Sequence, residues 1–150
     1  MTSLEAGDKA PAFKGVNQDG KEVSLKDFKG KKLVVFFYPK DGTPTCTVEA
    51  CNIRDGYAAL KKAGYEVLGV SPDSQKKHQN FIAKHELPYN LISDPDKEVA
   101  NAFEVWGPKK FMGKVNDAIH RTTFLIDEKG KLERVIGKVK SKEHTTQILE

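Results

Sequence analysis

The chain contains only two cysteines, Cys46 and Cys51, five positions apart in the stretch "TPTCTVEAC". A cysteine does chemistry as its thiolate, which acts as a nucleophile or as a metal ligand. Two cysteines are too few for the disulfide framework of a small secreted protein, so in a reducing compartment we expect them to be reactive, metal-binding or simply buried. His78 and His85 lie on a predicted helix and are expected to face solvent, and neither has a cysteine at the spacing of a structural zinc site. We therefore expect no metal and no other cofactor.

Cys46 lies in the first turn of a predicted helix that covers residues 45–62, with Pro44 at its start. At 100° per residue, Ala50, Ile53, Tyr57 and Leu60 fall within about 40° of Cys46, which places this cysteine on the core-facing stripe. The free N–H groups and the positive dipole end of the first turn favour an anion, so a thiol held there is expected to be acidified. The alternative is that Cys46 is only a small buried apolar residue.

Cys51 falls about 140° away from Cys46 around the same helix. The helical rise and radius separate the two Cα atoms by roughly 8.5 Å, whereas a disulfide requires less than about 7 Å. The two cysteines therefore cannot bond while the helix is intact. Either Cys51 only fills space, or the first turns of the helix unwind after Cys46 is oxidised, and Gly56 would make such unwinding easier.

The rest of the chain predicts helices and strands in alternation, which is typical of an α/β domain. We expect an N-terminal β-hairpin around Asp19-Gly20, then one capped helical turn, and a buried strand at 32–38. After the helix at 45–62 the sequence predicts a strand at 65–71, a helix at 74–85, a strand at 90–93 and a helical patch at 97–103. Two antiparallel strands around a 127–130 turn and a helix from Ser141 complete the chain. A parallel half followed by a late hairpin favours a thioredoxin-like fold, with a central mixed β-sheet flanked by helices, over a flavodoxin-like one.

Size and composition limit the possible functions. A chain of 150 residues fits one domain, which we assign to 1–150. The 25 Lys and Arg and 21 Asp and Glu are interspersed, with a net charge of +4, and no basic block suggests nucleic-acid binding. No apolar run is long enough to cross a membrane and the N-terminus does not read as a secretory signal, so we expect a cytoplasmic protein.

Two stretches, "YPKDGTPTCTVEACNIRD" and "HRTTFLIDEKGKL", together resemble the peroxiredoxins, in particular the Q-type branch of the bacterioferritin comigratory proteins. Pro39, Thr43 and Cys46 match the family pattern of Pro, three residues, Thr, two residues and Cys, and Cys51 matches its resolving cysteine. Arg121 matches the family's arginine ahead of a Thr-Phe-Leu-Ile-Asp run. The likeness covers nearly the whole chain from about residue 6.

The resemblance implies a thiol-dependent peroxidase that reduces hydrogen peroxide and organic hydroperoxides. It assigns attack on the peroxide to Cys46, resolution as an intramolecular disulfide to Cys51, and recycling to thioredoxin or glutaredoxin as partner. Lowering a thiol pKa from about 8.5 to about 6 raises the thiolate fraction at pH 7 only about 30-fold, so donors aimed at the peroxide oxygens must supply most of the rate. The resemblance gives that role to Arg121, the Thr43 hydroxyl and nearby backbone N–H groups, and it implies a monomer. Thr43 is also open to interpretation as a loop or capping residue, and Pro39 as a residue that ends the strand and shields the sulfur.

Several residues remain open to ordinary interpretations. Without the resemblance, Arg121 would be interpreted as a strand arginine in a surface ion pair, and Glu49 and Arg54 as helix-surface charge even though both match the family segment. Phe103, Trp106 and Phe111 are expected in the core rather than around the site.

The chain departs from the family at Thr45, where Gly is usual, and at Gly42, where Asn is usual. Two other functions also fit two cysteines. One is a thiol-disulfide oxidoreductase, although no Cys-x-x-Cys pair is present, and the other is a non-enzymatic peroxide sensor.

Overall fold

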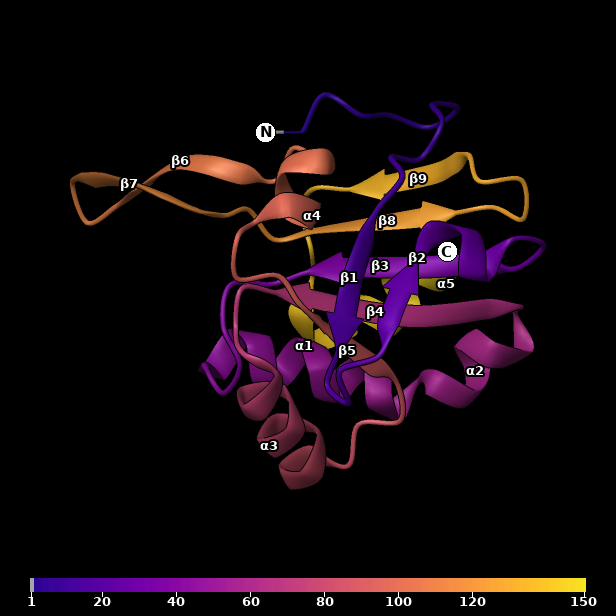
Figure 1. The fold of residues 1–150 in the computed structure, drawn as a ribbon, viewed down its shortest axis with the longest axis horizontal. Coiled ribbons are helices and arrows are strands. Elements are labelled where there is room, and N and C mark those ends of the chain that lie inside the picture. The colour runs from indigo at the N-terminus through magenta and orange to yellow at the C-terminus, as the bar shows by residue number, and fades with distance from the viewer. Residues whose placement is uncertain (1) are drawn as a thin grey trace.

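A seven-stranded mixed sheet forms the centre of the molecule (Figure 1). The computed structural model describes residues 2–150. The strands lie in the order β2-β1-β5-β4-β3-β8-β9, which confirms the predicted fold class. Their bounds are β1 Lys14–Asn17, β2 Glu22–Ser24, β3 Lys32–Phe37, β4 Tyr65–Ser71, β5 Asn90–Ser93, β8 Thr122–Ile126 and β9 Leu132–Ile136. The predicted N-terminal hairpin is β1 and β2, and it extends this same sheet through β5.

The central strands are the apolar runs of the sequence. β3 pairs in parallel with β4, and β8 lies antiparallel on the other side of β3, with Phe37 opposite Thr122. Phe36 and Phe37 point to opposite faces of β3, and both are fully buried because each face of the sheet carries its own apolar cluster. The strand is therefore covered on both sides, as its continuous apolar sequence predicts.

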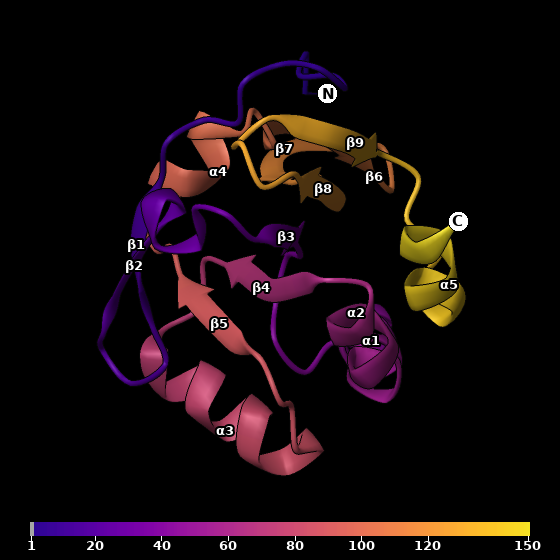
Figure 2. The ribbon, with the colours of Figure 1, turned by 90° about the vertical axis from the view of Figure 1, so that its right-hand side faces the viewer.

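Helices cover the two faces unequally (Figure 2). One face packs against α1 Pro44–Asp55, α2 Tyr57–Lys62, α3 Gln75–His85 and α5 His144–Leu149. The other face packs against α4 Glu98–Ala102 and the N-terminal segment, and short 3₁₀ turns occur at η1 Leu25–Phe28 and η2 Ser141–Glu143. No helix among residues 2–150 has the length and apolar character needed to span a bilayer.

The predicted helix at 45–62 is broken at Gly56 into α1 and α2. A Cβ atom at Gly56 would lie 2.2 Å from Cγ2 of Thr145, so only glycine leaves room for the packing of α5 at this position. Asn52 ties α1 to the same region, since its Nδ2 donates to the Lys142 carbonyl at 2.8 Å and its Oδ1 accepts from the Thr145 N–H at 2.8 Å. The C-terminal segment is thus fastened along the middle of α1.

A hairpin that the sequence did not predict protrudes from the sheet, with strands β6 Trp106–Phe111 and β7 Lys114–Ile119 (Figure 1). The side chain of Phe111 at its tip is 74% exposed, so its expected place in the core was wrong. Phe103 is fully buried, and Trp106 is half-buried against the same core, as predicted. Because the hairpin is polar along most of its length, it lacks the alternating apolar pattern by which a half-buried strand is recognised.

Candidate functional site

Cys46 lies in the first turn of α1, immediately after the loop that leaves β3. Its side chain is 2% exposed and faces the same apolar cluster as Ala50 and Ile53. The thiol is free. Thr43 is the N-cap residue in an extended conformation and Pro44 is the first helical residue, as expected where the first N–H groups need no intrahelical partner. The sulfur therefore lies near the positive end of a helix of 12 residues.

Arg121 reaches this sulfur from the opposite end of the sequence. Since Phe37 pairs with Thr122, residue 121 lies beside the carboxyl end of β3, where the chain turns toward α1. Its Nη2 lies 3.2 Å from Sγ of Cys46. This contact brings together the two residues that the sequence placed 75 positions apart. Its neighbour His120 points the other way and contacts the Pro108 carbonyl, as the alternation of an extended chain predicts.

Glu49 is the second partner of Arg121. Its Oε1 accepts from Nη1 at 2.5 Å, and the carboxylate is fully buried. Burial raises the pKa of Glu49 to about 7 even though the nearby Arg121 charge lowers it. Burial disfavours the charge of Arg121, but Glu49 and Cys46 outweigh this effect and raise the Arg121 pKa above its usual value. One guanidinium thus binds the sulfur and a buried carboxyl at the same time.

The expectation that Glu49 is surface charge was wrong. Glu49 follows Cys46 by three residues, which places it about 60° away on the helical wheel, on the edge of the buried stripe. That spacing was the available signal. Arg54 does lie on the outer side of α1, where its Nε pairs with Asp55 at 2.9 Å.

Thr43 and Pro39 lie in the loop between β3 and α1, and both are half-buried. The Thr43 hydroxyl donates to the Lys40 carbonyl at 3.0 Å, so in this state it closes the loop on itself. Pro39 follows the end of β3 directly. Both residues therefore border the turn in which Cys46 lies.

Asp41 anchors this loop to the helix α3. Its Oδ2 lies 2.6 Å from Nδ1 of His78, and its Oδ1 accepts from the Tyr38 hydroxyl at 2.5 Å. His78 is fully buried and its Nε2 lies 3.1 Å from the Ile92 carbonyl, so the expectation that it faces solvent was wrong. Because two buried side chains, Tyr38 and His78, hold Asp41 in this way, the loop is kept in one conformation.

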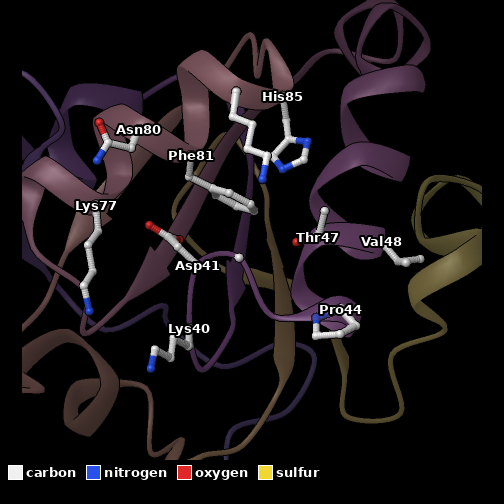
Figure 3. A pocket seen from close by; sticks show the side chains of 11 residues that line it. Lys40, Asp41, Pro44, Thr47, Val48, Lys77, Asn80, Phe81 and His85 are labelled. Carbon is white, nitrogen blue, oxygen red and sulfur yellow. The ribbon is translucent and has the colours of Figure 1, made fainter.

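A groove of about 660 Å³ lies between this loop, α1 and α3 (Figure 3). Pro44, Val48 and Phe81 give it an apolar lining, and lysines from the loop and from α3 border it. Cys46 is not part of its wall. The groove follows the side of α1 on which Cys51 lies, because Cys51 is three residues after Val48.

Cys51 is partly exposed and free, in the intact helix α1. It lies neither on the apolar stripe nor at the contact between Cys46 and Arg121. In this state of the protein, α1 is continuous from residue 44 to residue 55, and the two thiols are not joined. No group of three or more His, Cys, Asp or Glu side chains among residues 2–150 is arranged to hold a metal ion.

The site combines a cysteine at a helix N-terminus with an arginine that is distant in the sequence, and a mixed thioredoxin-like sheet brings the two together. Comparison with known proteins identifies the family that has this arrangement. Residues 6–135 match the AhpC/TSA family model, and the chain belongs to this family. Among its relatives are peroxiredoxin Bcp of Escherichia coli K12, 49% identical over 99% of this chain and 96% of the relative, and peroxiredoxin Bcp of Bacillus subtilis 168, 45% identical over 99% and 94%.

Solved structures agree with this assignment. Peroxiredoxin Q of Xanthomonas campestris superposes on this structure with a TM-score of 0.89 at 36% sequence identity. The superposition covers 96% of this chain and 94% of the peroxiredoxin Q chain. The bacterioferritin comigratory protein of the same organism, described in terms of its alkyl peroxide reduction activity, has a TM-score of 0.88 at 35% identity over 99% and 95%. The resemblance to Q-type peroxiredoxins that the sequence indicated is thereby confirmed.

Proposed function

We propose that this protein is a thiol-dependent peroxidase in which Cys46 attacks the peroxide. The observation that carries the proposal is the 3.2 Å contact between the buried Cys46 sulfur and Nη2 of Arg121 at the first turn of α1. A cationic donor and free helical N–H groups stabilise a thiolate, and the same donors stabilise negative charge that develops on a peroxide oxygen.

The first step transfers one oxygen atom. The Cys46 thiolate attacks one peroxide oxygen, the O–O bond breaks, and Cys46 becomes a sulfenic acid. The other oxygen leaves as an alkoxide or hydroxide and takes a proton to become an alcohol or water. Arg121 is the donor best placed to bind the peroxide oxygens, and the half-buried Thr43 would reach them once its hydroxyl turns from the Lys40 carbonyl. Pro39 borders the site and would limit the access of water to the sulfur.

The second step joins the two cysteines. The Cys51 thiol attacks the Cys46 sulfenic sulfur, which forms a disulfide and releases water. The intact α1 keeps the thiols apart, so its first two turns must unwind, and the helix is weakest at its free N-terminus and at Gly56. A thioredoxin- or glutaredoxin-type dithiol then reduces the disulfide and is itself oxidised.

The substrates we propose are hydrogen peroxide and organic hydroperoxides, and the alkyl peroxide reduction described for the Xanthomonas campestris relative supports the second class. We also propose a cytoplasmic monomer. Both thiols of the cycle lie in one chain, so turnover requires no second copy. Size-exclusion chromatography with light scattering tests the monomer.

The experiment that tests the cycle compares the wild type with Cys51→Ser in a thioredoxin-coupled peroxide assay. We expect Cys51→Ser to consume one equivalent of peroxide at the wild-type rate and then to stop, because Cys46 remains oxidised. Steady-state cycling of Cys51→Ser with thioredoxin at the wild-type rate would refute the role of Cys51. Cys51→Ser should also be more readily oxidised to the sulfinic acid by excess peroxide.

A further inference from the structure

The carboxyl group of Glu49 is bound on only one side. Oε1 is bound by Arg121, whereas Oε2 is buried and has no hydrogen-bond partner among residues 2–150. A buried carboxylate oxygen without a donor is costly, and such groups in folded proteins require an explanation. Nε2 of His144 lies 3.5 Å from Oε2.

The ring of His144 is fully buried at the start of α5 and is held in one orientation. Its Nδ1 lies 2.9 Å from Oε1 of Gln147, and this amide is itself fixed because its Nε2 donates to the Lys138 carbonyl and its Oε1 accepts from the Lys140 N–H. Nδ1 therefore carries a hydrogen, and Nε2 of the neutral ring is an acceptor. The hydroxyl of Thr123, which lies 2.7 Å away, donates to it.

When both groups are unprotonated, Oε2 of Glu49 faces only the acceptor side of the His144 ring. Burial raises the pKa of Glu49 to about 7 and lowers the pKa of His144 to about 4, so between these two pH values the carboxyl is protonated and the ring is neutral. The bond to Gln147 raises the pKa of His144, whereas the positive charges of Arg121 and Arg134 lower it further.

Two other titratable groups lie within the field of this pair. The Cys46 sulfur is bound to the same guanidinium, and Tyr89, just before β5, has its pKa raised by burial and by the Glu49 charge. Tyr89 donates its hydroxyl hydrogen to the Ala50 carbonyl at 2.7 Å and stays neutral. Around the sulfur, the carboxyl of Glu49 is therefore the group whose raised pKa places its change of charge near pH 7.

We propose that His144 is a positioning residue of the peroxidase site: it presents the acceptor Nε2, and no donor, 3.5 Å from Oε2 of Glu49 and thereby keeps this carboxyl protonated and neutral beside Arg121. The inference rests on the proposed role of Cys46. With the proton present, the charges of the Cys46 thiolate and Arg121 cancel. Without it, the site carries one additional negative charge, which opposes the thiolate.

The arrangement links the C-terminal helix to the reacting sulfur through four groups in direct succession. His144 contacts Glu49, Glu49 binds one nitrogen of Arg121, and the other nitrogen binds Cys46. Arg121 directly precedes β8, and Thr123, two residues later, lies on the same face of the extended chain, so one short segment orients both the guanidinium and the histidine.

The test measures the pH dependence of Cys46 alkylation by iodoacetamide in the Cys51→Ser background, where only one thiol reacts. In His144→Gln, the amide can donate to Oε2 and stabilise the ionised carboxylate. We expect the pH midpoint of alkylation to rise by about one unit, and the alkylation rate below the midpoint to fall about tenfold. In Glu49→Gln the side chain at position 49 cannot ionise. The double variant Glu49→Gln, His144→Gln should therefore show the same pH midpoint of alkylation as Glu49→Gln alone.

His85→Gln is the matched control, because this histidine lies on α3 against Phe81 and not beside Glu49, and it should leave the midpoint unchanged. An unchanged midpoint in His144→Gln would overturn the proposal, and so would a shift that persists in the Glu49→Gln background. Peroxide consumption is measured separately, so a failure of the peroxidase assignment can be told apart from a failure of this coupling.

A spectroscopic measurement covers the case in which His144→Gln does not fold. The infrared carbonyl band of a protonated carboxyl should be present in the reduced wild type at about pH 6, lost at about pH 9, and missing from Glu49→Gln. A difference spectrum between wild type and Glu49→Gln without this band would contradict the neutral carboxyl.

Discussion

Replacing Arg121 by methionine removes the cation from the site while it keeps a side chain of similar length. Two contacts are lost, from Nη2 to the Cys46 sulfur at 3.2 Å and from Nη1 to Glu49 at 2.5 Å. A hydrogen bond to a charged group contributes about 1.5–3 kcal/mol, so loss of the first contact should lower thiolate reactivity about 10- to 100-fold. Loss of a donor to the transition-state oxygen adds a further factor of about 100.

The same change should cost less stability than the loss of a buried ion pair usually does. Arg121 lowers the pKa of Glu49, which burial raises to about 7. Without the cation the carboxyl pKa rises further, and Glu49 is then neutral at pH 7 instead of being left as an unpaired buried charge. We therefore expect Arg121→Met to fold and to react with peroxide about 10³-fold more slowly than the wild type.

The assay is single-turnover peroxide consumption by the reduced protein at about pH 7, with circular dichroism to verify folding. Arg54→Met is the matched control, since Arg54 pairs with Asp55 on the outside of the same helix, and it should react at the wild-type rate. A folded Arg121→Met variant that reacts within tenfold of the wild type would refute the role assigned to the guanidinium.

Two further predictions concern stability. In the folded state the pKa of Glu49 is raised from 4.5 to about 7. The free energy of unfolding should therefore be highest below about pH 4.5 and should fall by up to about 3 kcal/mol as the pH rises from there through 7. Urea unfolding across this range should show the fall in the wild type and little of it in Glu49→Gln, and equal pH profiles would contradict the burial argument. Gly56→Ala should destabilise the protein by about 1–2 kcal/mol in urea unfolding, since the clash with Thr145 at 2.2 Å outweighs the gain of about 1 kcal/mol in helix propensity. A variant more stable than the wild type would show that α5 yields at this position without cost.

The sheet and most helices could be predicted because their residues repeat at the period of their elements. The apolar runs of β3 and β4, and the stripe of Ala50, Ile53 and Leu60 on α1 and α2, encode burial directly. The hairpin β6–β7 could not be predicted in this way, because its strands pair only with each other and bury little apolar surface. The close approach of Thr145 to Gly56 joins two distant parts of the sequence, and no local pattern encodes it.

The candidate site likewise contains residues whose place the sequence predicts and residues whose place it does not. The place of Cys46 in the first helical turn follows from local sequence, whereas its contact with Arg121 was expected only from the resemblance, since the pairing of β3 with β8 creates it. Glu49 had a local signal in its spacing from Cys46, but charge alone suggested the surface. For His144 no such signal exists, because its partners Thr123 and Glu49 come from two other elements.

The most direct test of the account compares the reduced wild type with Cys46→Ser in a peroxide assay coupled to a thioredoxin system. The wild type should consume many equivalents of peroxide per chain, and its oxidised form should contain a disulfide between residues 46 and 51. Cys46→Ser should consume none, although Cys51 is still present and partly exposed. Peroxide turnover by Cys46→Ser at a rate near that of the wild type would contradict the claim that the buried sulfur beside Arg121 is the reacting group.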